Sequence, residues 1–421
     1  MLDIRLLREN PDAIKTRLGT RSGQFAELVD HILAIDGRRR ESETRVQHLR
    51  AERNRLSKEI GALKKSGGDS LELESQVKAF ATELDELGNT ATELDTEQRD
   101  LLLRVPNLPA AGLPVGHDAS ANVAISHWGT PSPIKGEDHL SIGKRLGLFD
   151  LERAAKISGS GYILLTGAGA RLERALINFL LDLQTLNHGY TEIAPPVLVR
   201  RECMEGTGQL PKFEEDMYGF DGGASFLTPT AEVSLTNIYR DEILLESQLP
   251  IKLTACTPCF RRESGSAGRE TRGMIRVHQF DKVELVKITT PDQAESELRS
   301  LTADAEKVLQ LLMLPYRVLE LCTGDIGFSA SRTYDLEVWA PGQGAYLEVS
   351  SCSHFGDYQA RRMNLRYKNA EGKNQFCHTL NGSGTALPRL FVALLETHTQ
   401  KDGPLILPEA LQPYFGATQI G

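Results

Sequence analysis

Arginines gather on both sides of a glycine-rich stretch in the middle of the chain. Arg261, Arg262 and Glu263 end one strand-like run, and Arg276 follows Gly273 into the next. The guanidinium fork matches the paired oxygens of carboxylates and phosphates, so two strands joined by such a loop would bind a polyanion. A hairpin whose charges all face water is the alternative. We favour the polyanion site because the arginines sit beside apolar strand residues.

A carboxylate and a hydroxyl follow one another closely in a later strand-like run. Glu348 and Ser351 are separated by Val349 and Ser350. Hard oxygen ligands of this kind suit Mg²⁺ that bridges phosphate groups. Side chains three residues apart on a regular strand point to opposite faces. A shared metal ion therefore requires a bulge or a strand end between them.

A third polar segment, residues 381–389, predicts a glycine-rich turn from a strand into a helix. Pro388 stands where helices begin, and Arg389 falls in the first turn. Helix N-termini favour anions, and glycines let a ligand approach the backbone closely. The segment lacks the G-x-x-x-x-G-K-[S/T] pattern, which excludes a P-loop. A purely structural turn is the alternative for this segment taken alone.

The elements that must position these side chains follow one another without regular alternation. Hairpins and long helices in irregular order favour an α+β fold with a mixed, mainly antiparallel sheet flanked by helices, and exclude a Rossmann order. The turn at residues 341–344 predicts a β-hairpin. Expected strands are 190–197 (broken by prolines), 252–261, 275–288, 316–322, 333–340 and 345–351, and expected helices are 171–189, 231–244, 291–314 and 388–399.

Residues 28–103 carry apolar side chains at heptad spacing, which predicts two helices of coiled-coil type. Residues 65–70 form a short breaker cluster that ends the first helix, with Asp69 or Ser70 as the N-cap of the second. A short connection makes the two helices antiparallel. Gln98 is the polar exception on the apolar seam of the second helix. We therefore expect a long α-helical hairpin.

The two helices of this hairpin differ in charge. Residues 38–65 hold ten Lys/Arg against four Glu, and residues 71–100 hold nine acids against two bases. Mutual pairing of the helices is one interpretation, and a basic stripe that binds a phosphate backbone is the other. Both hold together if the charges occupy different faces. The residues of the expected basic stripe are Arg45, Arg50, Arg53, Arg55, Lys58, Lys64 and Lys65.

Composition places the chain among globular proteins of more than one domain. It has 421 residues, of which 40% are hydrophobic and 25% are charged. We find neither a membrane-spanning run nor a leader peptide, and we expect a cytoplasmic protein with no membrane partner. A net charge of −9 disfavours a surface that binds nucleic acid all over, but permits a local basic patch. A Pro/Gly-rich tract at about 105–130 suggests a linker, with an arm domain at 1–104 and a second domain at 105–421.

Six cysteines are too few for a disulfide framework and suit a reducing compartment. Cys256 and Cys259 form one C-x-x-C. No second pair follows at zinc-site spacing, and the surrounding residues alternate as in a strand. We therefore prefer a structural interpretation of this pair over a metal site.

Taken in order, these segments resemble the three signature motifs of class II aminoacyl-tRNA synthetases. The detailed strings are similar to those of the seryl-tRNA synthetase family of the bacterial type, which also has an N-terminal coiled-coil arm. The resemblance covers the chain nearly end to end. Its strings are T-A-E at 230–232, F-R-R-E at 260–263, R-V-H-Q-F-D-K-V-E at 276–284, E-V-S-S at 348–351 and N-G-S-G at 381–384.

The resemblance implies a two-step reaction. Serine and ATP would give seryl-adenylate and pyrophosphate, and serine would then pass to the terminal adenosine of tRNA(Ser), with tRNA(Sec) as a further candidate. It also implies Mg²⁺ and a homodimer built on the segment that ends at Pro195 and Pro196. The implied catalytic residues are Arg261, Arg276 and Arg389. The residues implied for ATP are Arg261, Arg262, Glu263, Val277, Phe280, Glu348, Val349, Ser350, Ser351 and Arg389, and those implied for serine are Thr230, Ala231, Glu232, Arg261, Glu284 and Ser383. Glu348 and Ser351 are implied for the metal, and the basic stripe for tRNA.

Three positions depart from the usual pattern of the family. Arg262 stands where a small residue is common, Val349 where isoleucine is common, and Pro388 where glycine is frequent. None of these changes removes a chemical group. Two rival functions remain. A synthetase-like ligase that loads a carrier protein would lack the arm, and a catalytically silent tRNA-binding protein would have lost its arginines and Glu348.

Overall fold

The computed structural model describes residues 1–21, 24–264 and 273–421. It divides into two compact units, residues 2–105 and residues 106–421, and Met1 belongs with the second. The glycine-rich stretch 265–272, part of the expected polyanion loop, lies outside the described residues.

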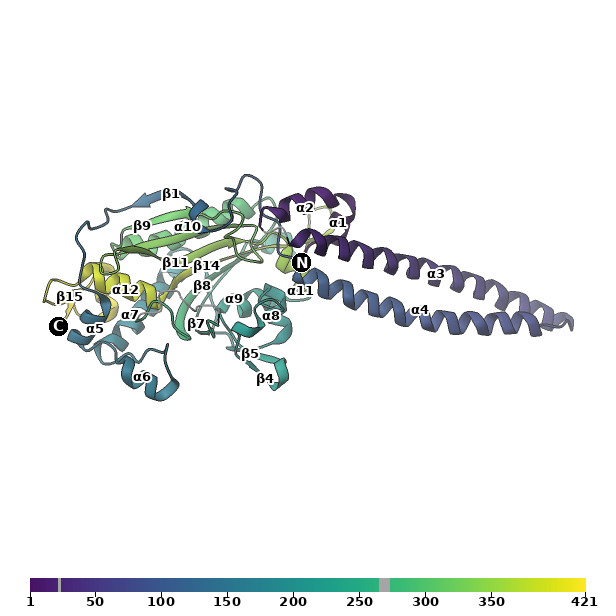
Figure 1. Ribbon diagram of the computed structural model, residues 1–421, viewed down its shortest axis with the longest axis horizontal. Helices are drawn as coiled ribbons and strands as arrows, with labels where there is room; N and C mark the ends of the chain where they lie inside the picture. Colours follow the sequence, from purple (N-terminus) through teal and green to yellow (C-terminus); the bar gives the residue numbers. More distant parts are fainter. Residues whose placement is uncertain (22–23, 265–272) are drawn as a thin grey trace. The chain divides into compact units, whose positions relative to one another are not determined.

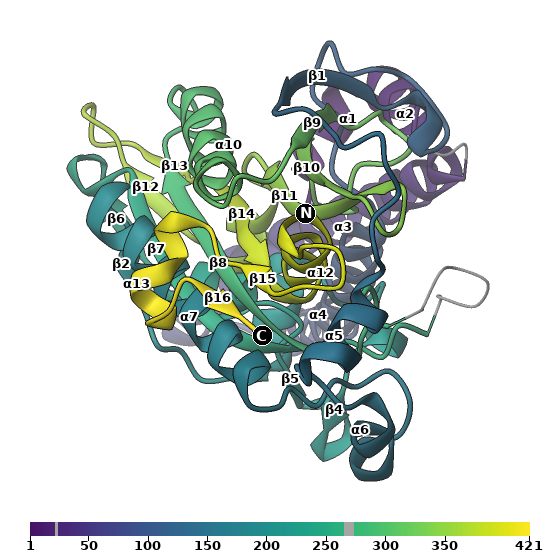
Figure 2. The ribbon, with the colours of Figure 1, turned by 90° about the vertical axis from the view of Figure 1, so that its left-hand side faces the viewer.

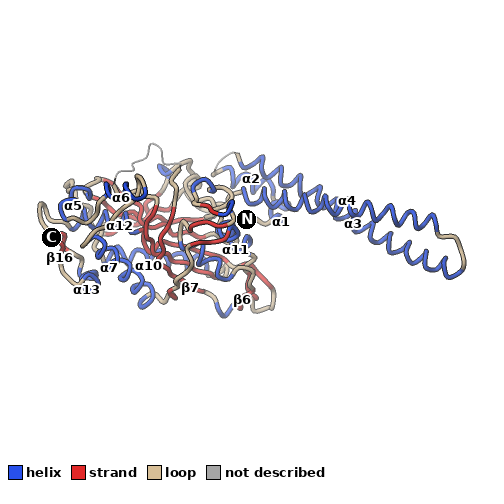
Figure 3. The backbone as a smooth tube through the Cα atoms, turned by 90° about the horizontal axis from the view of Figure 1, so that it is seen from below, coloured by secondary structure: helices blue, strands red, loops and turns tan. Residues whose placement is uncertain are grey.

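The unit 2–105 is helical. It contains α1 (Ile4–Glu9), α2 (Pro11–Gly19), α3 (Phe25–Ser66) and α4 (Leu71–Arg104). Helices α3 and α4 run side by side along their lengths (Figures 1 and 3). Gly67 ends α3 in the left-handed conformation, with φ of 73°, and the Asp69 carboxylate accepts the N–H of Leu71 at the start of α4. The expected helical hairpin is confirmed.

Apolar side chains fill the seam between α3 and α4, as the heptads require. Two polar residues interrupt them, because Asp36 on α3 and Gln98 on α4 are also buried there. Nε and Nη2 of Arg8 on α1 donate to its two carboxylate oxygens over 2.6 and 2.9 Å, and Gln98 on α4 donates over 2.9 Å. Asp36 thus binds three helices of this unit together. The buried apolar residues of the seam are Val29, Ile32, Ile35, Leu49, Leu56, Leu94, Leu102 and Leu103.

The unit 106–421 is built on an eight-stranded sheet of order β1-β9-β10-β11-β14-β8-β7-β2 (Figure 2). All neighbours are antiparallel except β2 and β7, which confirms the expected mixed, mainly antiparallel sheet. Its strands are β1 (Val123–Trp128), β2 (Thr191–Glu192), β7 (Ile251–Phe260), β8 (Gln279–Thr289), β9 (Tyr316–Glu320), β10 (Arg332–Ala340), β11 (Ala345–His354) and β14 (His378–Ala386).

Long helices cover one face of this sheet. Apolar residues of α7 (Ala168–Asp182), α10 (Ala294–Leu311) and α12 (Leu387–His398) form a single core with strand residues such as Val283 and Leu285 on β8. Side chains alternate along a strand, so Lys282 and Glu284 point to the other face. The same alternation puts Leu380 of β14 in the core and Asn381 on the other face. Polar groups therefore collect on the face away from these helices.

Shorter elements surround the sheet. The helices are α5 (His139–Leu146), α6 (Leu151–Ser158), α8 (Arg201–Thr207), α9 (Ala231–Thr236), α11 (Tyr358–Met363) and α13 (Gln412–Phe415), with a π-helical turn at Leu183–Asn187 and short 3₁₀ turns at Ala119–Ala121, Glu214–Asp216, Asp221–Gly223, Asn237–Tyr239, Glu246–Gln248 and Glu409–Leu411. Three small sheets pair β3 (Leu198–Arg200), β4 (Gly219–Phe220) and β5 (Ser225–Leu227); β6 (Ile243–Leu245), β12 (Arg366–Lys368) and β13 (Asn374–Phe376); and β15 (Leu405–Ile406) with β16 (Gln419–Ile420).

Two expected elements are longer in the sequence pattern than in the structure. The helix expected over 231–244 ends at Thr236, because the Asn237 amide donates to the carbonyl of Val233 and Asp241 then adopts a positive φ of 61°. The strand expected over 190–197 pairs only at β2, since Pro195 and Pro196 have no N–H for a ladder. The expected β-hairpin at 341–344 is confirmed by the antiparallel pairing of β10 with β11.

Candidate active site

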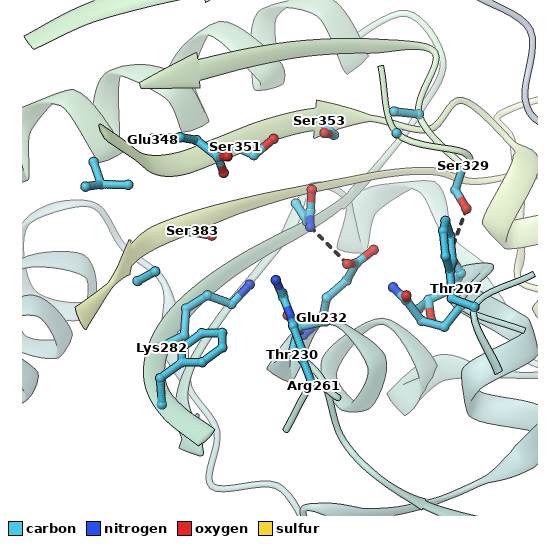
Figure 4. Close-up of a pocket in the computed structure, with 18 of the residues that line it drawn as sticks. Thr207, Thr230, Glu232, Arg261, Lys282, Ser329, Glu348, Ser351, Ser353 and Ser383 are labelled. Carbon is cyan, nitrogen blue, oxygen red and sulfur yellow. Dashed lines mark hydrogen bonds between the residues drawn. The ribbon is translucent and has the colours of Figure 1, made fainter. Parts of the chain in front are cut away.

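A cavity of about 500 Å³ lies over the polar face of the sheet. Strands β8, β11 and β14 supply its floor and walls, together with the first turns of α9 and α12 and the residues that follow β7. Glu348, Ser351 and Ser353 follow one another along β11, and Thr230, Glu232 and Lys282 lie across the cavity from them (Figure 4). The three polar segments of the sequence thus meet in one place, although they are far apart along the chain.

One end of the cavity is acidic. Glu232 on α9 and Glu284 on β8 are both buried, and the Asn381 amide donates to both carboxylates over 3.0 and 3.1 Å. Thr230 is the N-cap of α9, and its hydroxyl donates to Glu284 over 3.2 Å. Lys282 forms an ion pair with Glu284. Two carboxylates with one cation between them leave room for a second positive group.

The Glu232 carboxylate is the group without a cation of its own. Among the residues that the structure describes, the side chain of Glu232 accepts hydrogen bonds from the amides of Gln359 and Asn381, and no ion pair reaches it. Burial, and then the neighbouring charge of Glu284, raise the pKa of Glu232 to about 7. A ligand ammonium placed here would relieve that electrostatic cost.

The other end of the cavity is basic. Arg261 at the end of β7 donates from Nε to the Pro229 carbonyl over 3.2 Å, and its guanidinium lies 5.3 Å from the centroid of the Phe280 ring. Arg276 forms an ion pair with Glu263. These contacts fix the two guanidinium groups, one just after β7 and one just before β8, where they line the cavity. An anion bound between them would meet rigid donors.

Arg389 stands in the first turn of α12, as the sequence predicts. Its Nε donates to the Ile275 carbonyl over 3.1 Å, and its Nη1 donates to the backbone carbonyl of Glu348 over 2.8 Å. The Glu348 carboxylate lies 3.4 Å from the same nitrogen. Arg389 therefore connects the backbone next to Arg276 with Glu348 on β11.

The β-bulge that a shared metal ion requires is present on β11. The register against β10 shifts so that Leu336 faces Ser350 while Glu337 faces Glu348, and Val349 is the extra residue. Glu348, Val349 and Ser351 all line the cavity. The bulge thus removes the objection that Glu348 and Ser351 would face opposite sides.

Asp335 on β10 lies behind this pair. It stands opposite Ser351 in the ladder, and its Oδ1 is a buried oxygen with no hydrogen-bond partner among the residues that the structure describes. Burial and then the charge of Glu348 raise its pKa well above the ordinary value, against a hydrogen bond with Ser351 that lowers it. The bulge region therefore holds an oxygen-rich cluster that gains from added positive charge.

Most of the residues that the resemblance assigns to substrates line this one cavity, and four do not. Arg262 instead stacks on Tyr218, with its guanidinium 5.2 Å from the ring centroid. Glu284 reaches the cavity wall through Lys282 and Asn381. Ala231 is buried in α9, and the Ser350 hydroxyl donates to the Ser383 carbonyl over 2.6 Å. The predicted residues that line the cavity are Thr230, Glu232, Arg261, Glu263, Arg276, Val277, Phe280, Glu348, Val349, Ser351, Ser383 and Arg389.

Sequence reasoning assigned no role to Lys282, Asn381 or Asp335. Lys282 precedes Glu284 by two residues on one strand, and Asn381 precedes Ser383 by two, so alternation along predicted strands was a usable signal for both. Asp335 carried no such signal, because its importance depends on the pairing of β10 with β11.

The expected basic stripe lies on α3 and shows two kinds of residue. Arg45 pairs with Glu83 and Lys64 with Glu74 across the hairpin, each at 2.7 Å. Arg55 pairs within its own helix. In the described part of the chain, no ion pair is formed by Arg50, Arg53, Lys58 or Lys65. Helix pairing is therefore present, and the binding of a phosphate backbone by the remaining basic residues stays a prediction.

The two cysteines of the C-x-x-C lie on β7. Burial raises the pKa of both thiols above the ordinary range, which disfavours the thiolate that binds metal ions. Within residues 1–21, 24–264 and 273–421, the protein has no helix with the length and apolar character needed to cross a membrane.

Comparisons with known family models cover both units. Residues 1–109 match the model described as the seryl-tRNA synthetase N-terminal domain. Residues 221–398 match the class II core domain of the tRNA synthetases for G, H, P, S and T. Each match falls on one of the two compact units, apart from a few residues beyond position 105.

Full-length relatives and solved structures give the same result. The chain is 60% identical to the serine–tRNA ligase of Akkermansia muciniphila over 421 residues, which cover 100% of this chain and 99% of that one, and 51% identical to the enzyme of that name from Pelobacter propionicus over 428 residues, with coverage of 100% and 99%. The seryl-tRNA synthetase of Pyrococcus horikoshii complexed with ATP superimposes with a TM-score of 0.94 at 36% identity, covering 100% of this chain and 99% of that one. The cytoplasmic serine–tRNA ligase of Naegleria fowleri in complex with AMP gives 0.89 at 28% identity, with coverage of 100% and 98%.

Proposed function

We infer that this chain, which belongs to the seryl-tRNA synthetase family, is a serine–tRNA ligase that uses ATP to join serine to tRNA. One observation of the structure supports this function above the others. A single cavity has an acidic end with a hydroxyl-bearing wall and a basic end beside an oxygen-rich strand. Serine and ATP carry the complementary groups, since one presents an ammonium and a hydroxyl and the other a chain of phosphates.

The acidic end is our proposed serine site. Glu232 would receive the ammonium, because it is the buried carboxylate without an ion pair among the described residues. Thr230, Glu284 and Ser383 would surround the side-chain hydroxyl, and Ala231 would hold the turn in place. Alanine would leave these buried polar groups unpaired, and threonine would not fit beside them. The pocket would therefore reject both the amino acid that lacks the hydroxyl, alanine, and the one with an extra methyl group, threonine.

The basic end is our proposed ATP site. Arg261 would bind the α-phosphate and the serine carboxylate, Arg276 would assist it, and Arg389 would hold the γ-phosphate. Phe280 would stack on the adenine, and Glu263 would accept its amino group. Val277, Val349 and Ser350 would shape the walls, and Arg262 would contact the nucleotide only by leaving Tyr218.

The chemical step needs positioning more than acid–base catalysis. The serine carboxylate attacks the α-phosphate, and pyrophosphate leaves on the opposite side. Both reactants are anions, so the arginines lower the barrier by holding them together and by stabilising charge on the phosphate oxygens. Seryl-adenylate then passes its acyl group to a hydroxyl of the terminal adenosine of tRNA(Ser), and we extend this proposal to tRNA(Sec).

Magnesium fits the residues at the bulge. The Glu348 carboxylate and the Ser351 hydroxyl are hard oxygen ligands on the same side of the strand, and Asp335 Oδ1 is buried behind them without a partner in the part of the chain that the structure describes. When bound, Mg²⁺ would supply positive charge to the phosphate oxygens. The donor set contains oxygen alone, which suits Mg²⁺ rather than zinc.

The other parts of the proposal concern the protein as a whole. Residues 1–104 would form the arm that binds tRNA through the basic stripe, residues 105–421 would form the catalytic domain, and the reaction would take place in the cytoplasm. A homodimer would form on the helix–strand segment that ends at Pro195 and Pro196, where Leu186 is 78% exposed and β2 is an edge strand; the exposed Leu198 follows this segment directly. Burial of these leucines against a second copy would remove apolar surface from water.

Serine-dependent exchange of pyrophosphate into ATP tests the adenylation step. We expect exchange with serine and at most background exchange with alanine or threonine. Arg261→Ala should reduce exchange to background, and Arg317→Ala is the matched control because its guanidinium stacks on Tyr346, 4.3 Å from the ring centroid, and does not line the cavity. Absence of exchange with every amino acid would refute the function and favour a silent tRNA-binding protein.

A further inference from the structure

A buried carboxylate lies at the far end of the helix that carries Arg389. Glu396 is 0% exposed, seven residues beyond Arg389 on α12. Its two oxygens accept hydrogen bonds from the backbone N–H groups of His139, Gly342 and Gln343 over 3.1, 2.9 and 3.1 Å, and from the Gln343 amide over 2.6 Å. A buried carboxylate that accepts this many hydrogen bonds holds the donor residues His139, Gly342 and Gln343 in fixed positions.

The His139 ring lies between this carboxylate and residues 273–276, the segment that carries Arg276. It is the first residue of α5, which lies beside α12 (Figure 2). Its Nδ1 is 3.0 Å from Glu396 Oε1, and its Nε2 is 3.4 Å from the backbone nitrogen of Met274. A carboxylate only accepts, so Nδ1 carries the proton and Nε2 is left as the acceptor for the Met274 N–H. The Gln343 amide nitrogen lies 3.3 Å from the same Nδ1, but it donates to Glu396 over the shorter distance of 2.6 Å. Glu396 and the Met274 N–H therefore set the tautomer of the ring.

Gly273 shows how closely the chain passes this ring. It has a positive φ of 70°, and a Cβ at this position would lie 2.2 Å from Nε2 of His139. Any side chain here would push the ring away or lift the backbone off it. Gly273 and Met274, which precede Arg276, thus pack directly against the His139 ring.

The next residue is held from the same helix. The carbonyl of Ile275 accepts from Nε of Arg389 over 3.1 Å. Helix α12 therefore holds residues 274–275 at two points. Arg389 contacts Ile275 directly, and Glu396 contacts the His139 ring that accepts the N–H of Met274. Residues seven apart on a helix lie on one face about two turns apart, which matches this arrangement. Arg276 follows immediately and lines the cavity.

We propose that His139 and Glu396 are positioning residues for ATP in the adenylation step. They fix the backbone of Met274 and Ile275 so that Arg276 and Arg389 face the phosphates together. The serine pocket has no part in this chain of contacts, because its residues are held through Asn381, Gln359 and Lys282. Loss of the pair should therefore weaken ATP binding and spare serine binding. The inference rests on the proposed function, since it assigns the basic end of the cavity to ATP.

His139→Asn is the test variant. Asparagine can still donate to Glu396 from the place of Nδ1, but it does not reach Met274. We expect the KM for ATP in pyrophosphate exchange to rise about tenfold, because a buried N–H loses its acceptor. The KM for serine should change less than twofold. His139→Gln should restore much of the loss, since its amide oxygen reaches the place of Nε2.

His398→Asn is the matched control. His398 is also a mostly buried histidine on α12, and its Nε2 lies 2.8 Å from the carbonyl of Leu312, far along the sequence from residues 273–276. It should lower thermal stability without a selective change in the KM for ATP. Gly273→Ala provides a second variant should His139→Asn fail to fold, and it should show the same ATP-selective loss.

The outcomes separate this inference from the proposed function. If the unaltered chain shows no serine-dependent exchange, the function itself fails. If it shows exchange but the His139 and Gly273 variants keep the KM for ATP, or raise both KM values equally, the positioning role is overturned. A selective rise in the KM for ATP that glutamine reverses would establish it.

Discussion

The raised pKa of Glu232 predicts that serine binding depends on pH. An ionised Glu232 attracts the ammonium of serine, and a protonated one does not. With a pKa of about 7, roughly one molecule in eleven is ionised at pH 6, against ten in eleven at pH 8. The free amino acid keeps its ammonium throughout this range. If only the ionised form binds, the KM for serine should be about tenfold higher at pH 6 than at pH 8.

The sign of this effect follows from the cause of the shift. Burial, and then the charge of Glu284, favour the protonated carboxyl of the free enzyme. Serine supplies a positive group and so favours the carboxylate. Binding must therefore release a proton below pH 7 and weaken as protons become more abundant. Lys282 does not cancel the effect, because it is already paired with Glu284.

Pyrophosphate exchange at saturating ATP, measured at several pH values from 6 to 8, gives the KM for serine directly. Glu232→Gln should bind serine weakly, with a KM that no longer changes with pH. The KM for ATP serves as the internal control, because Glu232 is proposed to bind serine and is not one of the residues proposed to bind ATP. A KM for serine in the unaltered enzyme that varies less than twofold over this range would refute the reasoning.

Three further predictions follow from other parts of the molecule. Deletion of residues 28–103 should leave serine-dependent exchange nearly unchanged and abolish aminoacylation of tRNA; equal loss of both would contradict the division of labour. Glu348→Gln should raise the Mg²⁺ concentration needed for half-maximal exchange about tenfold, measured by magnesium titration, because a charged ligand is lost; an unchanged requirement would place the metal elsewhere. Asp36→Asn should lower the free energy of unfolding by about 1–3 kcal/mol in urea denaturation, because Arg8 loses a buried charged partner; no change would show that the polar group on the seam is dispensable.

Periodic features of the sequence were predictable because they depend on neighbours along the chain. Heptad spacing predicts the hairpin of α3 and α4, and the turn at 341–344 predicts the pairing of β10 with β11. The helix pattern after residue 231 failed beyond Thr236, because a side-chain hydrogen bond from Asn237 outweighs the apolar spacing. Local propensity is a weak guide where one capping contact decides the end of a helix.

The polar interior was less predictable, because its partners are far apart in sequence. Glu396 and His139 are separated by 257 positions, and Gln98 and Asp36 by 62. No pattern within either segment shows that a charge will be buried there. The resemblance to a family supplied the groups that we propose to bind substrates, since those belong to short strings. It did not identify the groups that hold the strings in place.

Ion pairs within the cavity neutralise its cationic side chains when no substrate is bound. Arg276 pairs with Glu263, Arg389 with Glu348, and Lys282 with Glu284. Unpaired cations in a partly buried site would be unstable, and ion pairs with exposed side chains are weak enough to exchange. Arg389 and Glu348 are 26% and 46% exposed, so this pair is the one that a phosphate can open most easily. A phosphate bound to Arg389 would free the Glu348 carboxylate next to Ser351, where the magnesium ligands are proposed. We therefore expect nucleotide binding and metal binding at this edge to be coupled through the ion pair of Arg389 and Glu348.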